Sequence, residues 1–176
     1  MQGTHSLSGH TTMIRRATLG LLAALCLLTS RIAMAEAPDT RDVKTIAACL
    51  QSFDKATAPQ EAYEACVSRI ANRCMKDNGA LDRKQVECFD RERMVWDKIV
   101  NDSYKTMMDG LEPEQQDKLK AMQRSWIHTR DLTCTFWYDY FQGSMANPMM
   151  ASCNNRETAR RAIYLRIFAN DLAQRK

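Results

Sequence analysis

The residue types that carry most enzyme chemistry are sparse in this 176-residue sequence. After residue 35 it has a single histidine, His128, so it cannot form a two-histidine metal site. It contains no C-x-x-C pair, no glycine-rich phosphate loop and no G-x-S-x-G elbow. We therefore predict a protein that is not an enzyme and that holds no metal and no cofactor.

One short stretch, QRSWIHTRDLTC at residues 123–134, combines residue types that could recognise a partner. At helical spacing Gln123, Trp126, Arg130 and Cys134 fall on one stripe. A guanidinium on an apolar stripe is costly to bury unless a carboxylate pairs with it. The stripe is thus either a buried structural latch or a binding surface. The candidate binding residues are Gln123, Arg124, Trp126, Arg130 and Asp131.

The N-terminal segment is typical of a secretory signal peptide. Arg15 and Arg16 precede an apolar run over residues 17–30, and AMA at residues 33–35 is a small-x-small cleavage site. Cys26 follows a leucine where a lipoprotein would have a small residue, so cleavage after Ala35 is preferred to lipidation. We predict a signal peptide over residues 1–35, with Met13 as a second candidate start, and a periplasmic or secreted protein.

The charge of the exported chain is close to neutral. The whole sequence has 25 basic and 21 acidic residues, but three of the arginines lie in the predicted signal peptide, so 22 basic residues remain against 21 acidic ones. This balance does not indicate a nucleic-acid partner. Residues 36–176 are enough for one domain, and no later apolar run is long enough to span a membrane.

Breaks rich in glycine and proline divide the exported chain into four to five predicted helices. The breaks are TAP at residues 57–59, DNG at 77–79, DGLEP at 109–113 and GSMANP at 143–148. They leave helices from about residue 42, 60, 82 and 113, and a last helix from about residue 154 to the C-terminus. The β-branched alternation of strands is absent. The predicted fold is an all-α, disulfide-stapled antiparallel helical bundle.

Six cysteines remain after residue 35, which is an even set in an exported protein. Residues equidistant from the turn of a helical hairpin lie side by side. Three sequential pairs each straddle a predicted turn, so we predict the disulfides Cys49–Cys66, Cys74–Cys88 and Cys134–Cys153. Alternatives among the first four cysteines, such as Cys66 with Cys88, remain open.

The turn at residues 109–113 also sets the expected partner of Arg130. Counting outward from it places Asp97 level with Trp126, and Glu92 level with Arg130. We therefore predict that Arg130 is first a latch paired with Glu92 or Asp97, and that its exposed flank, Arg124 and Asp131, is a secondary binding surface. The structural motif comprises Glu92, Trp96, Asp97, Asn101 and Tyr104.

The aromatic run FWYDYF at residues 136–141 and two methionine pairs have alternative interpretations. The run could be a stacking platform for sugar rings, but we favour a core role for Trp137, Phe141 and Phe136, with Tyr138 and Tyr140 at the edge. The pairs at 107–108 and 149–150 could hold copper(I), but methionine more often fills gaps in a core.

Several segments together resemble a known family of small exported domains. They are CFDRERMVWDKIVNDSYKTMMDGL, LKAMQRSWIHTRDLTC and TARRAIYLR, with the ordered residues Trp96, Asp97, Asn101, Tyr104, Leu111, Gln123, Trp126, Arg130, Asp131, Cys134 and Cys153. This pattern, over residues 66–166, is similar to the domain first named for the lysozyme inhibitor LprI. The resemblance implies an exported helical domain, with lysozyme inhibition in a few members of the family. We therefore predict a periplasmic protein that blocks a lysozyme (muramidase) by occupying its cleft, without chemistry of its own. The expected partner is a lysozyme or another envelope protein. The alternative is an envelope structural or interaction module without inhibitory activity.

Overall fold

The computed structural model describes residues 37–55, 58–78 and 81–175. The chain divides into two units, Met1–Ala35 and Glu36–Lys176, and only the second is described here. The predicted signal peptide lies outside the described residues. All regular structure in the described ranges is helical, so the predicted all-α class is confirmed. Within these ranges no helix combines the length and apolar character needed to cross a bilayer.

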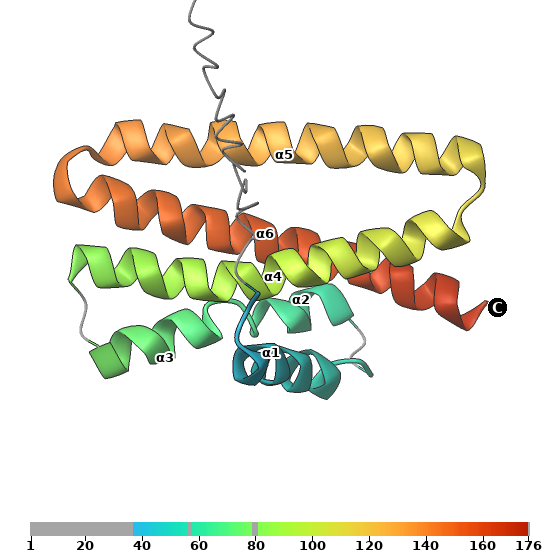
Figure 1. Cartoon of the computed structure of the whole chain (residues 1–176), viewed down its shortest axis with the longest axis horizontal. Helices are drawn as coiled ribbons and strands as arrows, with labels where there is room; N and C mark the ends of the chain where they lie inside the picture. Colours follow the sequence, from blue (N-terminus) through green and yellow to red (C-terminus); the bar gives the residue numbers. More distant parts are fainter. Residues whose placement is uncertain (1–36, 56–57, 79–80, 176) are drawn as a thin grey trace, which may run out of the picture. The chain divides into compact units, whose positions relative to one another are not determined.

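Six helices make up the described part of the second unit (Figure 1). They are α1 (Thr40–Ser52), α2 (Pro59–Glu64), α3 (Arg69–Asn78), α4 (Asp82–Gly110), α5 (Pro113–Phe141) and α6 (Gly143–Gln174). The long helices α4 and α6 pack against each other along the middle of the bundle, with α5 on one side and the short helices α1–α3 on the other. Helix α6 therefore contacts elements on both sides.

Two segments differ from the helices expected from the sequence. The helix expected from residue 60 to the DNG break is two helices, because the chain turns at residues 65–68, where Ser68 adopts a left-handed backbone with φ of 65°. Helix α6 begins at Gly143, eleven residues before the expected start, and includes Pro148. Pro148 is the sixth residue of α6, so it removes the helical bond to the carbonyl of Ser144, and the burial of α6 along most of its length outweighs that loss.

The core lies where α1, α4 and α6 meet. Its fully buried side chains include Ile46 and Leu50 of α1, Trp96 of α4, and Ile163 and Leu165 of α6. The long helices are buried to very different extents, because α6 buries residues along most of its length whereas α5 buries only Leu119 and Cys134. Most of the surface of α5 is thus exposed.

Three disulfides join consecutive elements. They are Cys49–Cys66, Cys74–Cys88 and Cys134–Cys153, with Cα–Cα distances of 5.9, 5.5 and 5.4 Å. They link α1 to the turn after α2, α3 to α4, and α5 to α6. These are the sequential pairs that the spacing around the turns predicts.

Candidate functional site

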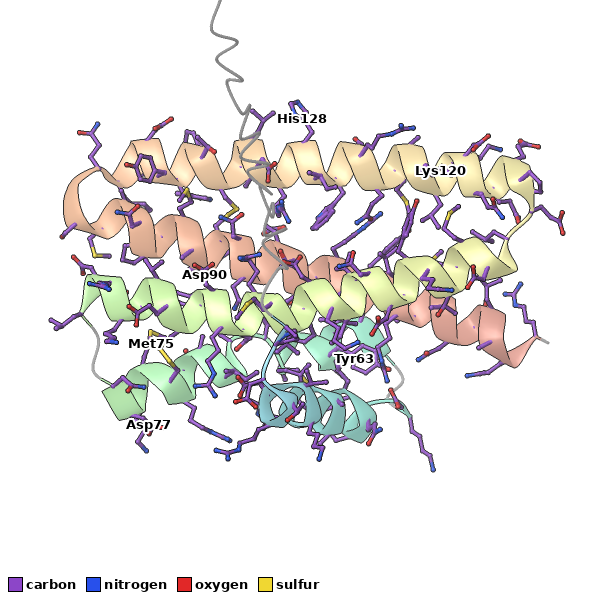
Figure 2. The ribbon with its side chains drawn as sticks, viewed as in Figure 1. Tyr63, Met75, Asp77, Asp90, Lys120 and His128 are labelled. Atoms are coloured by element: carbon purple, nitrogen blue, oxygen red, sulfur yellow. A yellow bond between two sulfur atoms is a disulfide. The ribbon has the colours of Figure 1, made fainter. Side chains whose placement is uncertain are left out.

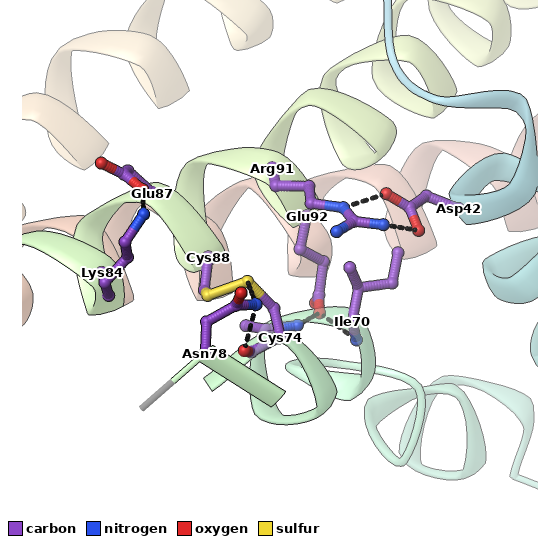
Figure 3. Close-up of a disulfide and its surroundings, with 10 residues drawn as sticks. Asp42, Ile70, Cys74, Asn78, Lys84, Glu87, Cys88, Arg91 and Glu92 are labelled. Carbon is purple, nitrogen blue, oxygen red and sulfur yellow. Dashed lines mark hydrogen bonds and ion pairs between the residues drawn. A yellow bond between two sulfur atoms is a disulfide. The ribbon is translucent and has the colours of Figure 1, made fainter. Parts of the chain in front are cut away.

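Glu92 of α4 is fully buried, and its carboxylate connects α4 to the start of α3 and to α6. Its carboxylate oxygens accept five hydrogen bonds, from the backbone N–H groups of Ser68 (2.6 Å), Ile70 (2.7 Å) and Ala71 (2.9 Å), from Trp96 Nε1 (2.9 Å) and from Asn155 Nδ2 (3.2 Å). Three of these donors are otherwise unsatisfied N–H groups at the start of α3, where a negative charge also complements the helix dipole. Figure 3 shows Glu92 extending from α4 to Ile70.

The predicted latch between Arg130 and Glu92 is wrong. Glu92 points toward α3 and Asn155 of α6, whereas Arg130 donates from Nε and Nη2 to its neighbour Asp131 at 3.0 and 2.9 Å. The alternative partner, Asp97, accepts instead from Arg93 Nη1 at 2.6 Å. The prediction assumed that α4 and α5 lie side by side along their whole length. In fact α4 and α5 make few contacts, and α6 packs against both of them.

Arg130 belongs instead to a row of alternating cations and rings between α5 and α6. Its guanidinium lies 4.9 Å from the ring centre of Trp126, and Arg161 lies 5.6 Å from the same ring and 5.5 Å from Tyr164. Gln123 joins this row by accepting a hydrogen bond of 2.8 Å from Arg161 Nε. We call Arg130, Trp126, Arg161 and Tyr164 the arginine–aromatic ladder. The structure thus brings together three of the predicted site residues, Gln123, Trp126 and Arg130.

Arg161 is the member of this ladder that sequence reasoning did not single out. It is only 8% exposed, and burial lowers the pKa of its guanidinium. No carboxylate pairs with it in the described part of the chain, and its Nη2 is buried without a hydrogen-bond partner there. The two rings compensate for its burial, because aromatic faces attract cations. The only sequence signal for Arg161 was its place in the segment TARRAIYLR, which is part of the family resemblance.

The remaining predicted residues do not join the ladder. Arg124 and Asp131 are exposed on α5, as expected for a flank, and Asn101 is exposed on α4. Tyr104 is partly buried against the core, where it has a structural role. The outer side of α5 also carries His128, which points away from α6 (Figure 2).

The core role predicted for the aromatic run is wrong for two of its three residues. Phe136 is 58% exposed and Phe141 is 38% exposed, whereas Trp137 is partly buried. The physical reason is that one helix, α6, lies beside this end of α5 and can cover only one of its faces. That face is taken by Cys134 and its disulfide. The methionine pair at 107–108, by contrast, packs in the core.

Arg130→Ala is expected to lower the melting temperature by only about 2–4 °C, because it removes a half-buried cation–π contact and a pair with a neighbouring residue, together worth about 1 kcal/mol. Thermal unfolding of the variant measures this. A loss of about 10 °C or more would contradict this arrangement of Arg130.

The same variant is expected to change the titration of Asp97. Burial raises the pKa of Asp97 above its ordinary 3.8, while the positive charges of Arg93 and Arg130 lower it. Because the pKa of Asp97 is higher in the folded than in the unfolded state, its protonation contributes free energy to folding. This contribution is complete below pH 3.8 and is lost as the pH rises through the folded-state pKa. Arg130→Ala should raise the pKa of Asp97 further, so the stabilising contribution of its protonation should persist to a higher pH. NMR titration of the Asp97 carboxyl would measure the shift.

Comparison with protein-family models matches residues 74–165 to the model described as "Lysozyme inhibitor LprI". The matched segment contains α4 and α5 entirely, most of α6, the whole ladder, and the disulfides Cys74–Cys88 and Cys134–Cys153. Neither the search of curated proteins nor the search of solved structures gives a match.

Proposed function

Because the chain belongs to the LprI lysozyme inhibitor family, we propose that it is an exported, non-catalytic protein that binds a lysozyme and blocks it. The family match is the observation that carries this proposal, since it covers the helices on which the candidate site lies. The three disulfides support an oxidising compartment, and the signal peptide expected over residues 1–35 supports the periplasm or export beyond it. Residues 36–176 are then the mature, single-domain protein.

Helix α5 is the part of the molecule best suited to meet a partner. Among the described residues it packs on the rest of the molecule along one side, so its outer surface can enter or cover a groove in another protein. The exposed Arg124 and Asp131 lie on this surface beside Ile127, which is 40% exposed. The ladder behind them fixes the middle of α5 on α6. Because this part of the helix is already fixed before a partner binds, little conformational entropy of the helix is lost on binding.

The proposed mechanism is steric. A lysozyme cleaves its glycan between two carboxyl groups in an open cleft, and a protein that occupies the cleft prevents the substrate from entering. No step requires a nucleophile or a general base from this chain. We therefore expect competitive inhibition, in which added cell-wall substrate relieves the block.

A lysis assay tests the proposal. The protein purified from the periplasm should slow the clearing of a cell-wall suspension by a c-type or a g-type lysozyme, by about tenfold or more at about 10 µM inhibitor. If it slows neither enzyme, the inhibitor function is contradicted, and the structural envelope module becomes the better account. Slow lysis by the protein alone would indicate an enzyme.

A charge reversal on α5 tests the binding surface. Arg124→Glu should weaken inhibition by about tenfold while the melting temperature stays unchanged, because the side chain is exposed and makes no intramolecular ion pair in the described part of the chain. Lys118→Glu is the control, since it makes the same charge change on the same helix, at an exposed residue whose surface ion pair with Glu114 contributes little to stability. Equal inhibition by both variants would exclude the middle of α5 as the contact.

A further inference from the structure

The C-terminal end of α5 carries a patch of aromatic side chains that the core does not use. Phe136, Tyr138, Tyr140 and Phe141 are all exposed, with Tyr140 the most exposed at 67%. Together with Trp137 we call these residues the aromatic end. A contiguous exposed patch of aromatic side chains is typical of a binding site.

Four of the five rings of the aromatic end, all except Tyr138, contact one another. Phe136 and Tyr140 stack with their ring centres 6.0 Å apart and their planes 25° apart, and Trp137 stacks on Phe141 at 5.8 Å and 30°. Edge-to-face contacts between Phe136 and Trp137 and between Tyr140 and Phe141 connect the two stacks. Because the rings already contact one another, a ligand that lies on them meets surfaces with little side-chain freedom left to lose.

A hollow with hydrogen-bonding groups adjoins Tyr138, the fifth ring of the aromatic end. It has a volume of about 360 Å³ and is lined by Tyr138, Asp139, Gln142, Gly143 and Ala146. The turn that shapes it uses two left-handed residues, Gln142 with φ of 49° and Gly143 with φ of 57°. Its lining supplies one carboxylate, one amide and one phenol, and none of its five lining residues is a cation.

We propose that the aromatic end and this hollow bind an uncharged oligosaccharide of N-acetylated amino sugars. The C–H face of a sugar ring is partly positive and stacks on the negative face of an aromatic ring, while its hydroxyl and amide groups need donors and acceptors beside that ring. The aromatic face of Tyr138 beside the hydrogen-bonding groups of Asp139 and Gln142 offers both kinds of contact, and the stacked rings at the same end of α5 extend the aromatic surface. The choice of amino sugars rests on the proposed function, because they make up the glycan that a lysozyme cleaves; the platform itself rests on the geometry alone.

Other occupants fit this surface less well. An acidic ligand, such as a nucleic acid or an anionic lipid, would meet the carboxylate of Asp139 without a compensating cation among the residues that line the hollow. A second copy of the chain in a symmetric dimer would place the same patch on both partners and bring their Asp139 carboxylates toward each other. A sugar has no charge to oppose Asp139, and its hydroxyl groups can donate to it.

Binding to an insoluble and a soluble glycan tests the proposal. The full-length exported protein should be retained on chitin beads and released by soluble tetra-N-acetylchitotetraose, and the same tetrasaccharide should change the tryptophan fluorescence, because Trp137 packs against Phe136. The double variant Phe136→Ala/Tyr140→Ala should bind the tetrasaccharide at least about tenfold more weakly, since it removes one of the two ring stacks. Its melting temperature should stay close to that of the wild type, because both side chains are exposed.

Phe168→Ala is the matched control, because Phe168 is an aromatic residue of α6 with 42% exposure that lies outside the aromatic end. It should bind the tetrasaccharide as the wild type does. The proposal is overturned if the wild type shows no binding at about 10 mM tetrasaccharide, a concentration well above the dissociation constant of a weak specific site. It is also overturned if the double variant binds equally well, or if Phe168→Ala loses binding to the same extent.

Lysozyme inhibition measured on the same samples separates this inference from the proposed function. Sugar binding without inhibition would leave the glycan site standing and contradict the inhibitor function. Inhibition without sugar binding would support the inhibitor function and overturn the glycan site. Loss of inhibition in the double variant, with no sugar binding by the wild type, would show that the aromatic end contacts the lysozyme and would overturn the glycan site.

Discussion

Glu92→Ala is expected to lower the free energy of unfolding by about 3–5 kcal/mol and the melting temperature by about 10 °C or more. The variant removes the acceptor of five hydrogen bonds at a position with no solvent exposure. Water cannot replace a buried acceptor easily, so the N–H groups of Ser68, Ile70 and Ala71 and the indole of Trp96 lose their partner. Thermal and denaturant unfolding would measure the loss.

Two further variants make this prediction specific. Glu92→Gln keeps the shape and one acceptor oxygen but places an NH₂ group against N–H donors, so about half of the loss should remain. Glu87→Ala, five residues earlier on α4, removes an exposed acid that pairs with the exposed Arg83 and Lys84 and should cost less than about 0.5 kcal/mol. If Glu92→Ala melts like Glu87→Ala, the carboxylate does not organise the start of α3.

Removing the disulfide between α5 and α6 with Cys134→Ala/Cys153→Ala is expected to cost about 3 kcal/mol. The two cysteines are 19 residues apart, and a loop of this length loses about that much closure entropy from the unfolded chain in the chain-entropy model. Both residues are buried, and this disulfide lies near the end of α5, which packs against α6 in the described part of the chain. Denaturant unfolding would measure the global loss.

Amide hydrogen exchange distinguishes the local effect of that disulfide from a general loss of stability. In Cys134→Ala/Cys153→Ala the amides in the C-terminal half of α5 should exchange faster than the rest of the protein, because that end is held by little else. The matched control, Cys74→Ala/Cys88→Ala, removes a staple of similar length between α3 and α4. In this control the ratio of amide exchange in α5 to exchange in the core should stay as in the wild type. Equal protection of α5 in both variants would contradict the weak attachment of that end.

The proposals for function divide α5 into two regions with separate tests. Its middle, around Arg124, is proposed to contact a lysozyme, and its C-terminal end, around Tyr140, is proposed to contact the glycan. An inhibitor that also holds the glycan would be concentrated where its target works, because binding at one site raises the effective concentration at the other. The two sites have different assays. Arg124→Glu should weaken lysozyme inhibition, and Phe136→Ala/Tyr140→Ala should weaken glycan binding.

Local patterns in the sequence were enough to predict the fold class and the family. Glycine and proline mark most of the breaks between helices, and the segments between them have no strand periodicity. The spacing of cysteines around the turns predicts the three pairs found in the structure, because a hairpin turn fixes which residues of consecutive helices can meet. Two helix boundaries were predicted wrongly, the turn at residues 65–68 and the start of α6 at Gly143, and both depend on packing between elements distant in the sequence. Pro148 removes one helical hydrogen bond, which the burial of α6 along most of its length outweighs.

The sequence by itself thus determined that the chain is helical and where most of its turns lie, and it favoured the three sequential cysteine pairs, because these properties depend on residues close together in the chain. The structure decided the pairing of the first four cysteines, for which the sequence left alternatives open. Only the tertiary structure decided the partners of Arg130 and Glu92 and the exposure of Phe136. Helical periodicity indicates which face of a helix is apolar, but it does not indicate which helix covers that face. Here α6, the last helix, packs against both α4 and α5. It therefore gives Arg130 a place beside Trp126 and Arg161, turns Glu92 toward the start of α3, and leaves the aromatic end of α5 uncovered.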